Sequence, residues 1–299
     1  MDKGLTHGRL ITLAPILEVK NLHHIYSAGT PFEHVALKDV SFSVERGEFV
    51  GVIGHTGSGK STLVQHLNGL LKPTSGQILL DGKDIWSDKA TVRQAKFRIG
   101  LVFQYPEYQL FEETVYKDIA FGPRNMKLSA EEIDKRVRDA ARLVGLTEQQ
   151  LLASPFDLSG GQKRRVAIAG VLAMEPEILI LDEPTAGLDP EGREEILAEI
   201  NAYRKEKNAT IMMISHSMTD VARLTDRLLV MNRAQLAFDG MPDEVFTHAE
   251  ALVDMGLDIP DVTRVFLKLR QLGIDVPKVY TVEQAVKVLT ELKRGDTDA

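Results

Sequence analysis

The sequence predicts an α/β protein built on a parallel sheet. Four short apolar runs have the length and continuity of strands that are covered on both faces. Helical patterns alternate with these runs, which is typical of an α/β core. The 299 residues, 43% hydrophobic and 26% charged, suit a globular protein with a core of normal size. The buried strands are expected at 49–53, 177–182, 210–215 and 227–232, and two of the helices at 130–145 and 161–174.

Periodicity and turn residues predict the other elements. In chain order they are a strand at 16–26, a second strand within 34–54 that turns at Arg46-Gly47 into the first buried run, a helix at 61–71 that stops before Pro73, and a hairpin at 76–85 around Asp81-Gly82. Beyond Gly240 the pattern changes to amphipathic segments at 243–255, 261–272 and 282–294. The chain is therefore divided into an N-terminal extension (1–15), a core (16–240) and a small, mostly helical C-terminal extension (241–299).

Charge and composition exclude several classes of function. With 36 basic and 43 acidic residues the net charge is −7, which argues against a nucleic-acid partner bound through a basic face. Cys is absent, so the chain has neither disulfides nor thiolate metal ligands. The sequence contains no run of about 18–20 apolar residues. We expect a soluble chain, and if it acts at a membrane another subunit must cross the bilayer.

The strongest motif is 54-GHTGSGKS-61, which fits the phosphate-loop pattern G-x-x-x-x-G-K-[ST] between a buried strand and a helix. Its glycines let backbone N–H groups turn inward toward phosphate oxygens, and Lys60 adds a cation for the β- and γ-phosphates. The Ser61 hydroxyl is expected to bind Mg²⁺. The alternative is a glycine-rich turn without a ligand. The residues predicted to bind the nucleotide here are Gly54, His55, Thr56, Gly57, Ser58, Gly59, Lys60, Ser61 and Thr62.

Two carboxylates end the apolar run 178-ILILDE-183. Asp182 is predicted to hold Mg²⁺, directly or through water, and Glu183 to orient or deprotonate the attacking water. A pair of solvated acids at a strand end is the alternative. A phosphate loop upstream in the same chain favours the catalytic interpretation.

The segment 158-LSGGQ-162 stands directly before the predicted helix at 161–174. Ser159 has the chemistry of a helix N-cap, and the glycines expose backbone N–H groups at the positive end of the helix. A plain cap needs the serine but not two glycines and a glutamine. These residues resemble the signature motif of ABC-type ATPases.

Further motifs of that family follow in the family's order across 16–240. The resemblance assigns Gln104 to the loop that reaches Mg²⁺ and the attacking water, Asp189 to the loop that crosses to a partner, His216 to the switch histidine and Tyr26 to the adenine. Taken singly, each has a structural alternative, such as strand packing for Tyr26. Together they imply ATP and Mg²⁺ as cofactors, with a P-loop core and a helical signature subdomain at about 105–175.

Three further segments indicate which members of the family this chain resembles most. The segments 66–76, 104–123 and 155–174 closely resemble the ATPase subunits of energy-coupling factor importers, most of all the second of their paired ATPases. In such systems two ATPase chains close head to tail on ATP, and the C-terminal extension helps them associate. The resemblance therefore implies that this chain acts on its partner's ATP through Ser159, Gly160, Gly161, Gln162 and Asp189.

The same resemblance implies the remaining partners and the location. A transmembrane coupling subunit is expected to dock near Gln104–Pro123, and a substrate-binding membrane subunit to capture a vitamin or a transition metal. The chain is expected to be a translocase ATPase, converting ATP and water to ADP and phosphate, on the cytoplasmic side of the cell membrane. The transported solute and the identity of the partner ATPase stay open, because recognition lies in other chains.

Three alternatives are weighed against this function. A conventional ABC importer or exporter would use the same motifs. A soluble ABC ATPase acting on DNA would need a long coiled coil, for which the span from Ser61 to Leu158 leaves no room, and ribosomal relatives usually carry two cassettes. A scaffold that binds ATP without hydrolysis would be expected to lack Glu183 or His216, and both are present.

Overall fold

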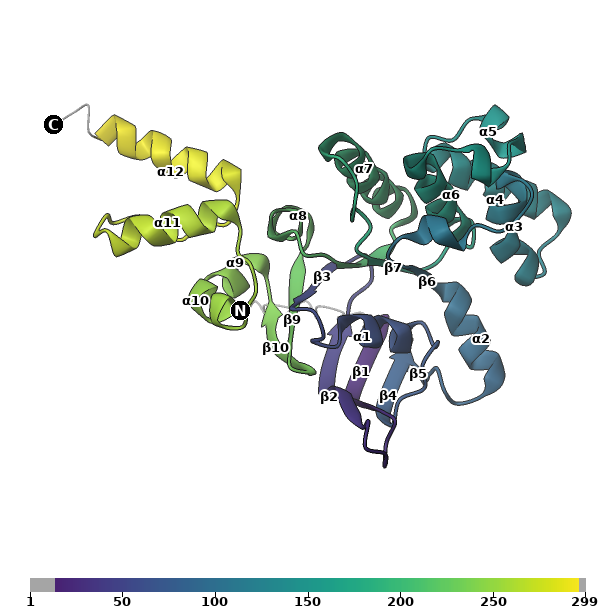
Figure 1. Ribbon diagram of the computed structural model, residues 1–299, viewed down its shortest axis with the longest axis horizontal. Coiled ribbons are helices and arrows are strands. Elements are labelled where there is room, and N and C mark those ends of the chain that lie inside the picture. Colours follow the sequence, from purple (N-terminus) through teal and green to yellow (C-terminus); the bar gives the residue numbers. More distant parts are fainter. Residues whose placement is uncertain (1–13, 296–299) are drawn as a thin grey trace, which may run out of the picture.

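A computed structural model describes residues 14–295 (Figure 1). Its central feature is a six-stranded sheet in the order β10-β9-β3-β8-β7-β6, in which all neighbours pair in parallel except β10 with β9. All four predicted buried strands are confirmed, since they form β3, β7, β8 and β9. The bounds are β3 Phe49–Gly54, β6 Ile99–Val102, β7 Ile178–Asp182, β8 Thr210–Ile214, β9 Arg227–Asn232 and β10 Gln235–Gly240.

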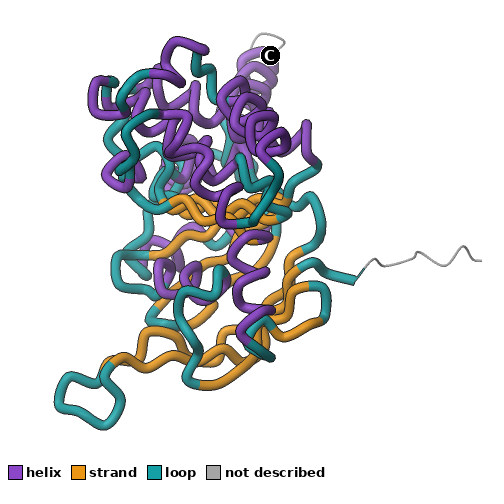
Figure 2. Tube along the Cα trace, turned by 90° about the vertical axis from the view of Figure 1, so that its right-hand side faces the viewer, coloured by secondary structure: helices purple, strands orange, loops and turns teal. Residues whose placement is uncertain are grey.

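A second, antiparallel sheet lies beside the first, in the order β2-β1-β4-β5. Its inward side chains, together with α1, pack against one face of the parallel sheet and form one core. Figure 2 shows the resulting layers, with strands in the lower part of the molecule and helices covering the other face. The predicted hairpin at 76–85 is confirmed. The bounds are β1 Leu17–Tyr26, β2 His34–Val44, β4 Ser75–Leu80 and β5 Lys83–Asp84.

Helices cover the opposite face of the parallel sheet and form the larger core. The predicted helices at 130–145 and 161–174 are confirmed as α4 and α6. The prediction of a helix at 61–71 extends past its observed end. Helix α1 ends at Leu67, and Gly69 takes the left-handed φ of 72°. The bounds are α1 Lys60–Leu67, α2 Lys89–Arg98, η1 Pro106–Gln109, α3 Val115–Asn125, α4 Ala130–Leu143, α5 Glu148–Leu152, η2 Pro155–Asp157, α6 Gly160–Leu172, α7 Pro190–Lys207 and α8 Met218–Leu224.

The chain after Gly240 is helical, as predicted, and lies at one end of the molecule (Figure 1). The amphipathic segment at 243–255 forms two short helices, which are separated at Thr247-His248. A small core of its own is centred on Phe266. The bounds are α9 Pro242–Phe246, α10 Ala249–Asp254, α11 Asp261–Gln271 and α12 Val282–Gly295. The division of the chain into domains stays a prediction, and the extension 1–15 lies almost entirely outside the described residues.

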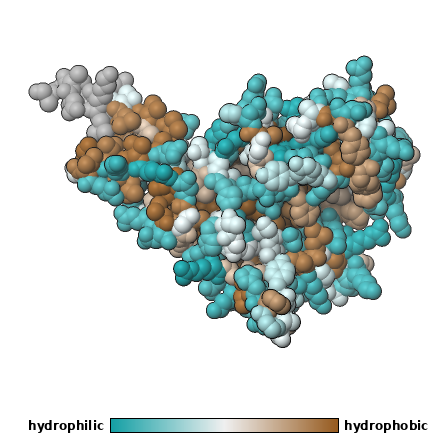
Figure 3. Space-filling view, in the orientation of Figure 1, coloured by the Kyte–Doolittle hydropathy of each residue, from teal (hydrophilic) through white to brown (hydrophobic). Residues whose placement is uncertain are grey.

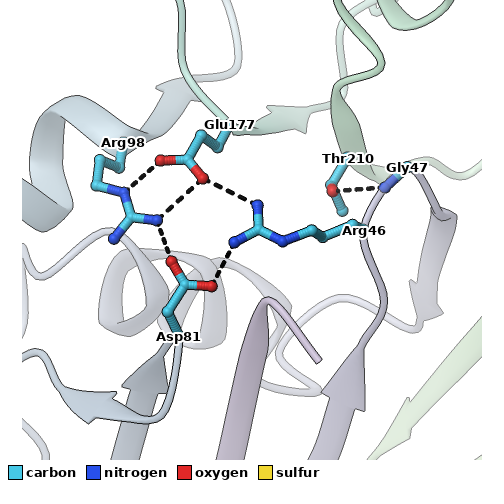
Figure 4. Close-up of polar contacts among 6 residues, drawn as sticks. All are labelled: Arg46, Gly47, Asp81, Arg98, Glu177 and Thr210. Atoms are coloured by element: carbon cyan, nitrogen blue, oxygen red, sulfur yellow. Dashed lines mark hydrogen bonds and ion pairs between the residues drawn. The ribbon is translucent and has the colours of Figure 1, made fainter. Parts of the chain in front are cut away.

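Four charged residues tie the two sheets together (Figure 4). Arg98, at the end of α2, and Arg46, in the turn before β3, both bond to Glu177 and to Asp81, which precedes β5. The guanidinium of Arg98 first, and then that of Arg46, hold the pKa of Glu177 below its usual value. Within residues 14–295, no helix has both the length and the apolar composition that crossing a bilayer would need.

We predict that Glu177→Gln destabilises the fold in a pH-dependent way. Because the folded-state pKa of Glu177 is lowered, its stabilising effect is present above the ordinary glutamate pKa and is lost as the pH falls through the folded-state value. The variant should melt about 2–5 °C below wild type near pH 7.5 and converge with it only once the pH has fallen below the folded-state pKa of Glu177. Glu45→Gln, an exposed change in the same turn, is the control for thermal unfolding. A pH-independent difference would contradict the ionic explanation.

Candidate active site

The phosphate loop connects the end of β3 to the start of α1 and is shaped by its glycines. A Cβ at Gly54 would lie 2.4 Å from the Met231 carbonyl oxygen, and one at Gly59 would lie 2.4 Å from that of Ala36. Gly57 and Gly59 also have left-handed φ values of 79° and 104°. A side chain at Gly54 or Gly59 would therefore force the loop away from its neighbours.

Lys60 is the cation of this loop and is buried, with 7% of its surface exposed. Its Nζ donates hydrogen bonds to the carbonyl oxygens of Gly54 at 2.6 Å and His55 at 3.0 Å. Burial lowers the pKa of Lys60, while the charges of Glu183 and Asp182 act in the opposite direction. The amine is thus held at the loop. A negatively charged phosphate bound there would favour the protonated form of Lys60 and so counter the effect of burial.

The two predicted acids lie at the end of β7, opposite the loop. Burial raises the pKa of Asp182, and a hydrogen bond from Ser61 and the charge of Lys60 counter that shift. Glu183 has the uncommon φ of 53°, which is typical of strained functional positions. Burial also raises its pKa against the effect of His216, whose Nε2 lies 3.3 Å from Glu183 Oε1. Two contacts therefore define this part of the site: Glu183 lies beside His216, and Asp182 accepts a hydrogen bond from Ser61.

Tyr26 and Gln104 reach the same space from other elements. Tyr26 ends β1, is 38% exposed, and places its hydroxyl 3.3 Å from Thr62 Oγ1. The edge of its ring meets His24 at 4.5 Å between centroids. Gln104 is exposed and follows β6. The aromatic ring of Tyr26 suits a base, and the amide of Gln104, which also lines the cavity, suits a phosphate group or its metal ion.

One cavity of about 400 Å³ brings these residues together from segments far apart in the sequence. It also contains His34, which the sequence analysis missed. His34 pairs with Tyr26 in the β1–β2 register, so only the strand pairing places it there. The lining residues are Tyr26, His34, Ala36, Thr56, Gly57, Gly59, Lys60, Ser61, Thr62, Gln104, Asp182, Glu183, Ile214 and His216.

The donor set fits Mg²⁺. Ser61, Gln104 and Asp182 all supply oxygen atoms to this cavity, and Mg²⁺ prefers oxygen ligands, usually one or two carboxylates completed by phosphate and water. Within residues 14–295 no cluster of three His, Cys, Asp or Glu residues forms a metal cage. These residues therefore suit a metal that arrives with a phosphate ligand.

The residues predicted to act on a partner's ATP do not line this chain's cavity in the part of the chain that the structure describes. Ser159 caps α6, accepting from the Gln162 N–H at 3.3 Å while Gln162 Oε1 accepts from the Ser159 N–H at 3.0 Å. Asp189 caps α7 by accepting from the Gly192 N–H at 2.9 Å. A Cβ added to Gly160 or Gly161 would meet no atom within 4 Å. Nothing in this chain's own packing requires glycine at those two positions.

The similarity to known proteins agrees with this geometry. The family model described as ABC transporter matches residues 37–186. The energy-coupling factor transporter ATP-binding protein EcfA2 of Clostridium perfringens is 55% identical over 282 residues, covering 94% of this chain and 99% of its own length. The protein of the same name from Clostridioides difficile is 55% identical over 280 residues, covering 93% and 97%.

The chain belongs to the family of energy-coupling factor transporter ATP-binding proteins. The family resemblance drawn from its motifs is thereby confirmed, together with the ABC-ATPase fold class. Among solved structures, cbiO1 from Clostridium perfringens, part of the ABC transporter complex cbiONQ, aligns with a TM-score of 0.71 and 42% identity, covering 87% of this chain and 97% of that chain. The dimeric ABC transporter cassette MJ0796 aligns with a TM-score of 0.67 and 30% identity, covering 76% and 98%.

We predict that Tyr26→Ala raises the ATP concentration needed for activity and leaves turnover at saturating ATP largely intact. Stacking of a base on an aromatic ring is worth about 1–3 kcal/mol, or roughly 5- to 150-fold in affinity. Tyr26→Phe is the matched control, because it keeps the ring and removes the hydroxyl contact to Thr62. Binding of a fluorescent ATP analogue and steady-state turnover separate the two effects. A fall in saturating turnover without a loss of affinity would place Tyr26 in the core.

Proposed function

We propose that this chain is one of two ATPase chains that drive an energy-coupling factor importer for a vitamin or a transition metal. The observation that carries the proposal is the single cavity in which Lys60, Asp182, Glu183, Gln104 and His216 meet. Each has the chemistry required for phosphoanhydride hydrolysis, and the five come from segments that the fold alone brings together. The names of the family relatives support the transporter class. That the solute is a vitamin or a transition metal is our proposal.

Within the cavity each residue has a defined task. The loop amides and Lys60 bind the phosphates, and Tyr26 stacks on the base. Ser61, Asp182 and Gln104 would hold Mg²⁺, which when bound neutralises phosphate charge. Glu183 accepts the proton of the attacking water, and the pKa raised by its burial makes it a stronger base than an exposed glutamate. His216, whose Nε2 lies 3.3 Å from Glu183 Oε1, orients that carboxylate.

The other half of each site is proposed to come from the partner. Nothing in this chain's own packing requires glycine at the first two positions of α6, so we infer that Gly160 and Gly161 have a role toward another molecule. A second nucleotide facing Ser159 supplies it, because the N–H groups of Gly160 and Gly161 lie at a positive helix end. Asp189 then approaches the same partner. The dimeric state described for MJ0796 bound to ADP and Pi supports this arrangement.

Docking of the coupling subunit is proposed at an apolar groove that is lined by residues 109–111, a few residues after Gln104 in the chain. A hollow of about 350 Å³ lies between η1, α3 and α6 and includes Phe111 and Phe121, which are 59% and 46% exposed. Their rings meet edge to face at 5.0 Å. An apolar groove rimmed by polar groups suits a helix from a membrane subunit. The complex named for cbiO1 supports such an assembly, with this chain peripheral on the cytoplasmic face of the membrane.

The C-terminal extension is proposed to associate with the second ATPase, an unlike paralogue of this chain. Figure 3 shows hydrophobic residues gathered over α11 and α12. On α12 the residues Val282, Val286 and Leu289 are each about half exposed and share one helix face. Such a stripe is typical of a helix that packs against another chain.

We predict that Glu183→Gln abolishes hydrolysis and keeps ATP binding. The amide preserves size and hydrogen bonding but cannot accept the proton of the attacking water, and removal of a general base typically costs 10²–10⁴-fold in rate. ATP affinity should persist, since Lys60 and the loop amides are unchanged. Turnover and ATP retention on the purified complex are the two measurements. Hydrolysis near the wild-type rate would remove Glu183 as the base.

A cross-link tests the shared site in the same variant. Because this chain has no Cys, Ser159→Cys here adds a single thiol, and a Cys in the phosphate loop of the partner ATPase completes a disulfide trap for a head-to-tail pair. ATP should increase the cross-link, and Glu183→Gln should prolong it. Cross-linking that ignores ATP would contradict the shared-site dimer.

Affinity purification from membranes distinguishes this function from that of a conventional ABC transporter. We predict that the tagged chain brings down an unlike ATPase, a transmembrane subunit and a small substrate-binding membrane protein, identified by mass spectrometry. A chain with Phe111→Glu and Phe121→Glu should keep the second ATPase and lose the membrane subunits, because charges in an apolar groove oppose docking. Recovery of a homodimer with a conventional permease would favour the alternative.

A further inference from the structure

Arg164, on α6 five residues after Ser159, is buried with 3% of its side chain exposed. Its guanidinium contacts two other segments of the chain. Nε and Nη2 donate to the two carboxylate oxygens of Glu107 at 3.0 and 2.8 Å, and Nη1 donates to the carbonyl oxygens of Ala186 at 2.7 Å and Pro184 at 3.4 Å. One side chain therefore joins the signature helix to two separate loops.

Each of those loops carries a residue of the proposed site. Glu107 lies in η1, three residues after Gln104, and the ring of Tyr105 between them stands 5.9 Å from the Arg164 guanidinium carbon. Pro184 and Ala186 belong to the loop that runs from Glu183 to the N-cap of α7. Arg164 thus contacts the backbone next to the proposed base and pairs with the loop that carries Gln104.

The contact is better suited to fixing geometry than to adding stability. Removing a guanidinium and a carboxylate from water is unfavourable, and their attraction offsets that cost only with good geometry. The planar fork reaches a carboxylate in two places and carbonyls with its remaining N–H groups, which a lysine ammonium cannot do. All of these contacts can therefore form together only when α6 and the two loops lie in one arrangement.

We propose that Arg164, with Glu107, is a positioning residue that holds the Gln104 loop and the loop after Glu183 to the signature helix. When the signature helix meets the partner's nucleotide, these two loops are held in the same arrangement, so the base and the amide reach their places together. The inference rests on the proposed function, because it assigns Arg164 a task in the hydrolysis carried out at that site. Arg164 itself touches no reacting atom.

The test compares Arg164→Lys with Arg165→Lys in the assembled transporter. Arg165 is the next residue on the same helix and pairs with Glu195 and Glu199 on α7, so it controls for loss of an arginine from α6. Arg164→Lys should lower kcat by about 10- to 100-fold, as misplaced catalytic groups do, with KM for ATP changed by less than about threefold. Arg165→Lys should keep kcat within about twofold.

Glu107→Gln is the second variant, and the double variant completes a cycle. If the two residues act as one unit, Glu107→Gln slows turnover similarly and the double variant is no slower than Arg164→Lys alone. Near wild-type kcat in either single variant would overturn the proposal. The proposal would also be overturned if ATP affinity, melting temperature and kcat all fell together, because that result indicates a structural role alone. Inactivity of the wild-type complex itself would instead refute the proposed function.

Discussion

The close approach of β3 to β9 at Gly54 is the constraint on which the nucleotide site depends. Gly54 pairs with Met231 in the parallel register, and the carbonyl oxygen of Met231 occupies the space that a Cβ would need. The turn after β9 then fastens the loop, because the Ala234 N–H donates to the Ser58 carbonyl oxygen at 3.2 Å. The Ala234 carbonyl in turn accepts from Lys38 of β2 at 2.7 Å. The phosphate loop is thus held by both sheets.

Around that fixed loop, burial disfavours the charged forms of Lys60, Asp182 and Glu183. The pKa of Lys60 is lowered, and those of Asp182 and Glu183 are raised, with burial the largest cause in all three. Opposite charges within the cluster partly counter these shifts. Mg²⁺ and phosphates would extend the same compensation, since a cation favours ionised Asp182 and an anion favours charged Lys60. The site is therefore preorganised for charges of both signs.

Motifs with a local mechanism could be predicted from the sequence. The glycine spacing at 54–61 and the carboxylates at 182–183 carry their own chemistry, and the apolar runs located the buried strands. The end of α1 was misplaced because Leu70 and Leu71 continue the apolar pattern after Gly69 has turned the chain. Features made by long-range pairing were out of reach. His34 lines the cavity because it pairs with Tyr26 in the β1–β2 register, and no local sequence pattern predicts such a pairing.

The most distant consequence concerns how movement at a membrane subunit could reach the water that attacks ATP. The segment after Gln104 is fastened at both ends, by Glu107 to Arg164 and by the N–H groups of Phe111 and Glu112, which donate to Asp118 at 3.4 and 3.1 Å. We expect a segment held in this way to move together with α3 and α6. Residues 109–111 of this segment line the proposed docking groove, so we expect a displacement there to be passed to Arg164 and, through its contacts, to the backbone beside Glu183. Coupling of this kind requires no contact between the membrane subunit and the nucleotide.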